Sequence, residues 1–120
     1  MNAAAIVPGS SEVVAINLIP VRSGVSVDDF ARFSATLDQP TCLAQDVVQS
    51  FDAYRITGGR IDATAFDVLE VMRVRSWPEW VRVRDGLDAL RPVTTRFDEL
   101  VDSLAVRTLF GTRITREHGR

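Results

Sequence analysis

The chain has 120 residues, with 14 basic and 16 acidic side chains and a formal net charge of -2 at pH 7. A chain of this length forms one domain and buries roughly two thirds of the surface of its unfolded form, which is enough for a hydrophobic core. This balance of charge offers no basic surface to a nucleic acid, and no apolar run approaches the roughly 20 residues of a membrane span, so we expect neither partner.

The cysteine and histidine content limits the chemistry further. Cys42 is the only cysteine, which excludes an intrachain disulfide and a multi-cysteine metal site. Residues 1–11 form an expected flexible start without the features of a secretory leader, so we expect a soluble cytoplasmic protein. The only histidine, His118, lies in the polar segment 115–120, which we expect to be a flexible tail. A histidine metal site, a Ser-His-Asp triad and a proximal haem ligand all need an ordered imidazole, so we expect no metal and no cofactor.

The first part of the chain predicts a strand followed by a helix. Residues 12–22 are rich in Val and Ile and end at Pro and Ser-Gly turn signals. Ser26 and Asp29 have the spacing of a capping box and precede apolar residues at helical spacing up to Asp38. Pro40 then predicts the end of this helix.

The middle of the chain predicts two more strands and a short helix. Residues 50–57 and 65–74 have the composition of strands and are separated by a glycine-containing loop. Ser76 and Glu79 form a second capping-box candidate for a helix that ends near Gly86. Both tryptophans lie in this helix.

The last part of the chain predicts a helix and a fourth strand. Pro92 suits the first turn of a helix with one apolar stripe, and residues 105–114 alternate as a strand does. The domain, expected over residues 12–114, thus has the order β-α-β-β-α-β. Its usual solution is an α+β sandwich in which a four-stranded antiparallel sheet carries both helices on one face.

Both faces of the two central strands are apolar. Two helices can cover only one face of a sheet, and an antiparallel sheet with one solvated face shows polar alternation that these strands lack. A second copy of the chain is the simplest cover for the other face, so we expect a homodimer. In the strand 65–74 the helix-facing set is expected to be Phe66, Val68, Glu70, Met72 and Val74, and the partner-facing set to include Leu69 and Val71.

Several segments of the sequence resemble a known family. They are residues 26–30 (SVDDF), 38–41 (DQPT), 48–51 (VQSF) with 54–56 (YRI), and 66–74 (FDVLEVMRV). In order and spacing they resemble the dimeric α/β-barrel superfamily with its ferredoxin-like fold, and within it the RedY-like proteins. The resemblance implies a homodimer with a pocket between each sheet and its helices. It also implies a cyclase or condensation-assisting role on a pyrrole- or indole-derived intermediate in bacterial secondary metabolism, including antibiotic biosynthesis.

Glu70 is the strongest catalytic candidate, because a lone carboxylate within an apolar strand is costly to bury without a partner. Asn17 on the neighbouring central strand is expected to face the same space. Burial raises the pKa of a carboxyl group toward neutrality, so this pair suits general acid-base chemistry. The alternative is structural: Glu70 pairs with an arginine, and Asn17 satisfies a backbone group.

Three further residues are candidates for substrate binding. Asp38 and Thr41 belong to the motif that carries the resemblance and are expected at the mouth of the pocket, although Asp38 also suits a simple Asx turn. Tyr54, on an expected edge strand, could donate its hydroxyl group to a carbonyl or imine, or it could be a rim residue. Cys42 is more typical of a buried small hydrophobic residue than of a nucleophile, and Trp77 and Trp80 are more typical of the core.

These observations predict an acid-base enzyme that acts on a small aromatic or heteroaromatic substrate, with Glu70 and Asn17 as the catalytic residues. Two other functions stay open. One is a cofactor-independent oxygenase that uses Asn17, Tyr54 and a tryptophan, and the other is a binding module that shields a reactive intermediate.

Overall fold

The computed structural model describes residues 8–60 and 65–117 of the chain. His118 and most of the expected flexible start lie outside these residues. So do residues 118–120 of the expected tail and residues 61–64 in the loop that follows the second strand.

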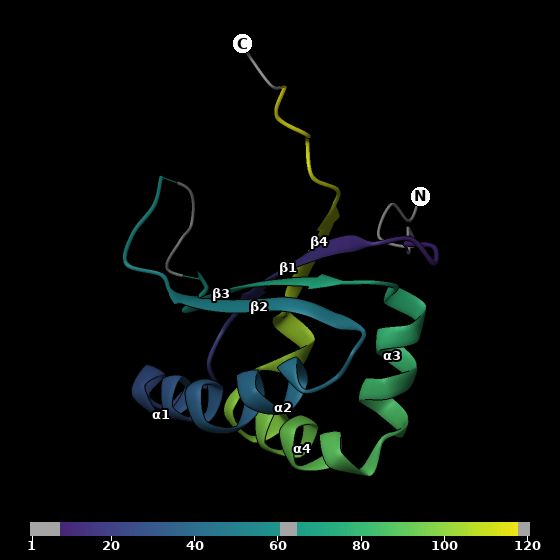
Figure 1. Cartoon of the computed structure of the whole chain (residues 1–120). Helices are drawn as coiled ribbons and strands as arrows, with labels where there is room; N and C mark the ends of the chain where they lie inside the picture. Colours follow the sequence, from purple (N-terminus) through teal and green to yellow (C-terminus); the bar gives the residue numbers. More distant parts are fainter. Residues whose placement is uncertain (1–7, 61–64, 118–120) are drawn as a thin grey trace.

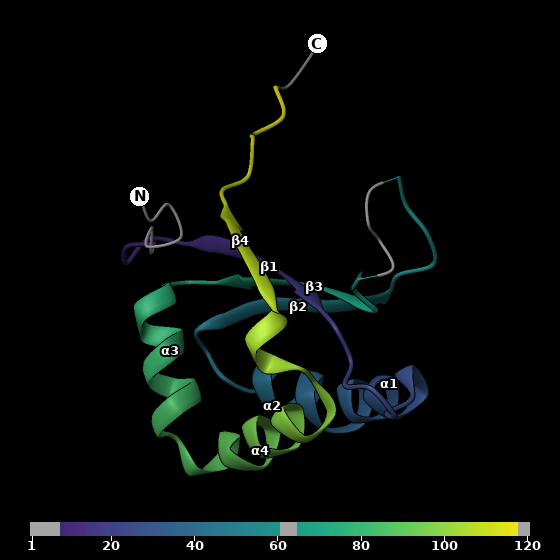
Figure 2. The same cartoon turned by 180° about the vertical axis from the view of Figure 1, so that it is seen from behind.

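The described residues form one antiparallel sheet that carries its helices on a single face, as Figure 1 and Figure 2 show from opposite sides. The strand order is β2-β3-β1-β4, so β1 and β3 occupy the centre, and the expected βαββαβ sandwich is confirmed. The strands are β1 (Val13–Ile19), β2 (Val48–Arg55), β3 (Val68–Val74) and β4 (Arg107–Gly111). The α-helices are α1 (Val27–Phe33), α2 (Gln39–Leu43), α3 (Trp77–Gly86) and α4 (Arg91–Leu100).

Serine side chains cap two of these helices, as the sequence predicts. The hydroxyl oxygen of Ser26 accepts a hydrogen bond from the backbone N–H of Asp29 at 3.1 Å, at the start of α1. The hydroxyl oxygen of Ser76 accepts one from the N–H of Glu79 at 3.3 Å, at the start of α3. Each bond satisfies a backbone donor that the first helical turn leaves free.

The prediction that Pro40 ends the first helix is wrong. After α1 the chain widens into a π-helical turn, Ser34–Asp38, in which the N–H of Gln39 bonds to the carbonyl of Ser34. Helix α2 then begins at Gln39, so Pro40 falls in its first turn. A proline is tolerated there because its missing N–H has no intrahelical partner to lose. The helical path therefore continues past the proline, and the π turn changes which side chains face the sheet.

Three strands are shorter than the sequence predicts: β3 begins at Val68 rather than at residue 65, and β1 and β4 both end early. Strand β1 ends at Ile19, before Pro20, which has no N–H for the ladder, and the next N–H, that of Val21, bonds to the Asp67 carboxylate at 2.8 Å. Strand β4 ends at Gly111, opposite Val14 near the start of β1, so the ladder offers no partner farther along.

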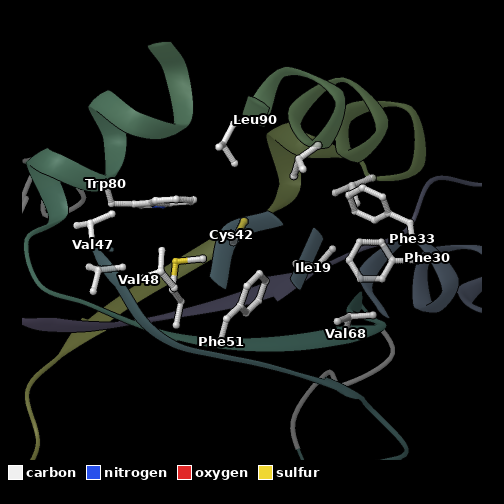
Figure 3. Packing of buried hydrophobic residues seen from close by; sticks show 14 of the residues in the cluster. Ile19, Phe30, Phe33, Cys42, Val47, Val48, Phe51, Val68, Trp80 and Leu90 are labelled. Carbon is white, nitrogen blue, oxygen red and sulfur yellow. The ribbon is translucent and has the colours of Figure 1, made fainter. Parts of the chain in front are cut away.

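The core lies between the sheet and the helices. In β3 every second residue is buried, which confirms that Val68, Glu70, Met72 and Val74 face the helices. Figure 3 shows the aromatic and aliphatic side chains that fill this layer, including Phe30, Phe33, Phe51, Trp80 and Leu90. Glu70 is the only acidic residue in the inward-facing row of β3.

The opposite face of the sheet is apolar and carries no helix of the described chain (Figure 1). Its central side chains are half-buried, and Leu109 on β4 is 59% exposed. The half-buried set comprises Val14, Ile16, Leu18, Leu69 and Val71. In the described ranges, 8–60 and 65–117, the helices are too short or too polar to cross a lipid bilayer.

Candidate functional site

A cavity of about 390 Å³ lies between the inner face of the sheet and the helices. It brings together residues from the central strands, from the helical segment around Pro40, and from α3 and α4. Its volume falls at the lower end of the range for small-molecule sites. Its lining consists of Asn17, Asp38, Cys42, Phe51, Glu70, Met72, Trp77, Trp80, Arg84, Asp85, Leu90, Val93, Thr94, Phe97, Asp98, Ser103, Val106 and Thr108.

Glu70 lies on the sheet side of this cavity and is only 4% exposed. The ladder places it between Ala53 on β2 and Asn17 on β1. No arginine of the described residues forms an ion pair with it, so the structural alternative of an arginine partner is not what the structure shows. Its Oε2 atom is buried without a hydrogen-bond partner among the same residues. An unpaired buried carboxylate oxygen is costly and rare.

Asp38 faces Glu70 from the helical side of the cavity and is 5% exposed. It is the last residue of the π-helical turn and has helical backbone angles, so the Asx-turn interpretation is wrong. The thiol of Cys42, one helical turn later, donates a hydrogen bond to Oδ1 of Asp38 at 3.4 Å. Asp38 therefore points into the cavity interior rather than forming a turn.

The two carboxyl groups behave as a coupled pair. Burial raises the pKa of Asp38 from 3.8 to about 6, against the opposing effect of its hydrogen bonds with Cys42 and Glu70. Burial also raises the pKa of Glu70 well above 4.5, and the negative charge of Asp38 and the hydrogen bond to it raise it further. The negative charge of Asp38 therefore favours the protonated form of Glu70. Two like charges this close in an apolar site cannot both ionise without a large penalty.

Asn17 is held beside this pair by a third strand. The hydroxyl of Thr108 on β4 donates a hydrogen bond to Oδ1 of Asn17 at 2.7 Å. The oxygen of the amide is thereby engaged, which leaves its NH₂ group for Glu70, and this hydrogen bond opposes the rise in the Glu70 pKa. Thr108 was not among the predicted site residues. Its place on the inward side of the alternating fourth strand was the one signal that could have identified it.

Aromatic side chains line the rest of the cavity. Trp80 is buried and extends from α3 into the interior (Figure 3). Trp77 packs edge-to-face on Phe110 with ring centroids 4.8 Å apart. Both tryptophans therefore belong to the hydrophobic packing, as expected, and both also line the cavity.

Thr41 and Tyr54 do not line this cavity. Thr41 lies in α2, and its carbonyl oxygen accepts a hydrogen bond from Nε2 of Gln45 at 3.3 Å. Tyr54 is on the edge strand β2, as expected, but it pairs with Leu69 and so belongs to the opposite face of the sheet, where it is 54% exposed. The structure brings together Glu70, Asn17 and Asp38, and it leaves the other two candidates outside.

Charged residues mark the helix side of the cavity. Nε of Arg84 donates to Oδ1 of Asp85 at 2.9 Å, and the hydroxyl of Ser103 donates to Oδ1 of Asp98 at 2.7 Å.

Burial and the neighbouring acids raise the pKa of the Cys42 thiol, which keeps it protonated and poorly nucleophilic. In the part of the chain that the structure describes, no group of three or more His, Cys, Asp or Glu side chains is arranged to hold a metal ion.

Comparison with solved structures shows the same fold in several proteins. HapK from Hahella chejuensis superimposes with a TM-score of 0.70 at 15% identity, over 90% of this chain and 98% of that one. SnoaB from Streptomyces nogalater, a cofactor-independent oxygenase, gives a TM-score of 0.66 at 12% identity, over 88% of this chain and 96% of that one. A dimeric ferredoxin-like protein from Thermobifida fusca gives 0.64 at 11% identity, over 90% and 96% of the two chains.

A search of the curated proteins finds no match to this sequence. A model of the family described as REDY-like protein HapK matches residues 13–114, which is most of the chain and includes every residue of the cavity. The match also agrees with the fold shared with HapK. The chain therefore belongs to the REDY-like HapK family.

Proposed function

We propose that this protein is a small, cofactor-free acid-base enzyme of bacterial secondary metabolism. It assists a cyclisation or condensation of an imine-bearing intermediate derived from a pyrrole or indole. The observation that carries the proposal is Glu70: a buried carboxyl group with a free oxygen, beside a second carboxyl group, in a cavity large enough for a small aromatic molecule.

The pair of carboxyl groups supplies the chemistry. Burial and the charge of Asp38 raise the pKa of Glu70 well above 4.5, which favours its protonated form. That form can give its proton to the nitrogen of an imine, which makes the neighbouring carbon more electrophilic. After the new bond forms, the same carboxylate can take a proton back from the product. Asp38, first expected to bind substrate, favours protonation of Glu70 through its charge, and Asn17 orients the Glu70 side chain.

The aromatic walls supply orientation. Trp77, Trp80, Phe51 and Phe97 present flat apolar surfaces against which a planar ring can stack. Holding a flexible reactive molecule in a near-attack shape can by itself contribute several kcal/mol to catalysis. Thr41 and Tyr54 remain substrate-binding candidates only for parts of a substrate that extend beyond this cavity.

We also propose that the functional unit is a homodimer formed through the uncovered face of the sheet. This face exposes apolar side chains of β1, β3 and β4, and burying it against a second copy removes the same patch from water on both chains. The structurally similar protein from Thermobifida fusca is dimeric, which supports the proposal.

Two rival functions remain to be separated from this one. An oxygenase that needs no cofactor has support in the fold shared with SnoaB, and it predicts oxygen consumption during turnover. A binding module that shields a reactive intermediate predicts tight binding with no change of product. Measuring dissolved oxygen and the product profile together distinguishes all three functions.

The test is genetic complementation. The gene is deleted from its host, and the metabolite profile is compared after complementation with the natural protein, with Glu70→Gln and with Glu99→Gln. Glu99→Gln is the same chemical change on the exposed surface of α4, where Glu99 forms an ion pair with Arg96 and with no other described residue. We expect the natural protein and Glu99→Gln to restore the product, and Glu70→Gln to leave the precursor unreacted. Full restoration by Glu70→Gln contradicts the proposal.

A further inference from the structure

We propose that the cavity selects a ligand with a positive charge on a flat ring system, such as a protonated or quaternary ring nitrogen, over neutral and anionic molecules of the same shape. This inference rests on the proposed function only in that both concern the same cavity. It is a statement about binding and does not require that any reaction take place.

The first support is the imbalance of charge around the cavity. Its acidic lining residues are Asp38, Glu70, Asp85 and Asp98, and Arg84 is its only basic one. Arg84 is already engaged, because Nε and one Nη atom both donate to the carboxylate of Asp85, at 2.9 and 3.4 Å. This leaves Asp38, Glu70 and Asp98 without a basic partner in the lining, and the negative charge of the carboxyl pair resides on Asp38.

The second and independent support is the unsatisfied oxygen of Glu70. Glu70 lines the cavity, and its Oε2 atom is buried and accepts no hydrogen bond from the described residues. Two neighbouring oxygens cannot supply a donor: the ionised carboxylate of Asp38 and Oδ1 of Asn17, which itself accepts from Thr108, are both acceptors. A ligand that places an N–H or a positive charge at this oxygen supplies the missing partner, and a charged partner forms the stronger hydrogen bond.

The third support is the nature of the walls. Trp77 and Trp80 both line the cavity beside the carboxyl pair. The face of an indole ring attracts a cation through its quadrupole, and tryptophan is the best of the aromatic residues in this respect. Burial strengthens both the ring contact and the contact with the carboxylate, because little water remains to screen the charges. An anion of the same shape is repelled by the same groups.

The test uses three probes of similar shape and different charge: the 1-methylquinolinium cation, neutral 1-methylnaphthalene and the 1-naphthoate anion. Binding to the full chain is followed by quenching of tryptophan fluorescence and by calorimetry at pH 7.5. We expect the cation to bind at least about tenfold more tightly than the neutral probe, and the anion to bind most weakly. Equal affinities, a preference for the neutral probe, or no binding of any probe to the folded protein overturns the inference.

Two variants and a control assign the preference to the carboxyl pair. We expect Asp38→Asn, which removes the ionised member of the pair, to lose most of the preference for the cation and to keep its affinity for the neutral probe. Glu70→Gln removes an acceptor oxygen but no charge of the ionised member, so we expect it to lose a smaller part of the preference. Asp88→Asn is the matched control, because Asp88 is exposed, lies outside the cavity lining and pairs only with Arg91. An unchanged preference in both cavity variants assigns selection to other groups and overturns the inference. Circular dichroism and a thermal melt of each variant show that the fold is intact.

The pH dependence gives a second readout. The titratable and charged groups around Asp38 and Glu70 are Cys42 on α2, Arg84 and Asp85 on α3, and Asp98 on α4. Because Asp38 ionises near pH 6, the affinity for the cation should rise as the pH increases through this region, and binding should release protons. A flat profile in the natural protein contradicts the inference. If the preference is present but Glu70→Gln still restores the metabolite, the proposed catalysis fails and this inference stands.

Discussion

Asp38 and Glu70 come from different layers of the fold and meet as a pair of carboxyl groups inside one cavity. Asp38 ends a π-helical turn, and Glu70 is the third of the seven residues of β3. Neither has an arginine or histidine partner among the described residues, and burial raises the pKa of both. Burying the pair therefore costs folding free energy. Its raised pKa values suit proton transfer, and a salt bridge to an arginine would lower them again.

The stability of the protein should fall as the pH rises through the Asp38 pKa. A carboxyl group whose pKa is higher in the folded state than in the unfolded state binds more protons when folded, so its contribution to stability is lost as the pH increases. For Asp38 the shift from 3.8 to about 6 corresponds to about 3 kcal/mol, lost between about pH 4 and pH 7. Urea unfolding at pH 5 and pH 7.5 should show the loss in the natural protein and a much smaller one in Asp38→Asn. Equal slopes in the two proteins contradict this account.

Asp38→Asn should stabilise the protein at pH 8. The substitution keeps the shape of the side chain and removes a charge that burial makes unfavourable. We expect a gain of about 1 to 3 kcal/mol in the free energy of unfolding, measured in urea. Asp52→Asn is a suitable control, because Asp52 is exposed on β2 and the substitution there removes a charge that remains in contact with water. A loss of stability in Asp38→Asn indicates that the charge is satisfied after all.

Thr108→Val should change the pKa of Glu70 without unfolding the protein. The substitution removes the 2.7 Å hydrogen bond that holds the amide oxygen of Asn17, so the amide can turn away from Glu70. Losing the amide hydrogen bond should raise the Glu70 pKa further, since that bond lowers it. Carbon-13 NMR of the glutamate carboxyl groups measures this shift, and Thr112→Val, beyond the end of β4, is the control. An unchanged Glu70 titration means that Thr108 has no positioning role.

Leu109→Asp should dissociate the proposed homodimer. Leu109 is 59% exposed on β4 and lies opposite Ile16 on the uncovered face, so a charge there has little effect on the single chain but must be desolvated in a dimer. We expect the dissociation constant to rise at least about tenfold, measured by analytical ultracentrifugation. Ala89→Asp, exposed on the helical side, should leave the dimer intact. A natural protein that is monomeric at all concentrations removes the basis for this prediction.

Cys42 should resist thiol reagents in the folded protein. It is 2% exposed, donates a hydrogen bond to Asp38, and has a pKa raised by burial and by the acidic neighbours. Thiolate is the reactive form, so we expect reaction with a disulfide reagent at pH 8 to occur only at the rate of unfolding. Titration in the presence and absence of urea measures the difference. Fast reaction without urea would show that the thiol is open to solvent and ionised.

The strand periodicity predicted much of the site. Alternation in β3 put Glu70 on the same face as Val74, which directly precedes a predicted helix, and this assigned Glu70 to the helical side. Asn17 on the neighbouring strand was expected to face the same space. Asp38 was identified as a candidate but given the wrong surroundings. From the sequence, Pro40 was predicted to end the helix. In the structure the π turn lets the helical path continue into α2, and it directs the Asp38 side chain into the cavity.

Tyr54 shows where periodicity needs information from the structure. The pairing of β2 with β3 is irregular between Val48 and Ser50, which changes the face of the residues that follow. The structure therefore pairs Tyr54 with Leu69 and puts Ala53 opposite Glu70. The alternation of β4 groups Thr108 with Phe110 on one face, but only the register of β4 against β1 shows that Thr108 lies opposite Asn17.

The most direct test of the central claim is the protonation state of Glu70 at neutral pH. Carbon-13 labelling of the Glu and Asp carboxyl groups, with assignment from Glu70→Gln and Asp38→Asn, allows both titrations to be followed by NMR from pH 4 to pH 9. We predict that at pH 7 Glu70 is protonated and Asp38 is largely ionised, with a midpoint near 6 for Asp38. Ordinary titration of both groups, complete below pH 5, would contradict the account.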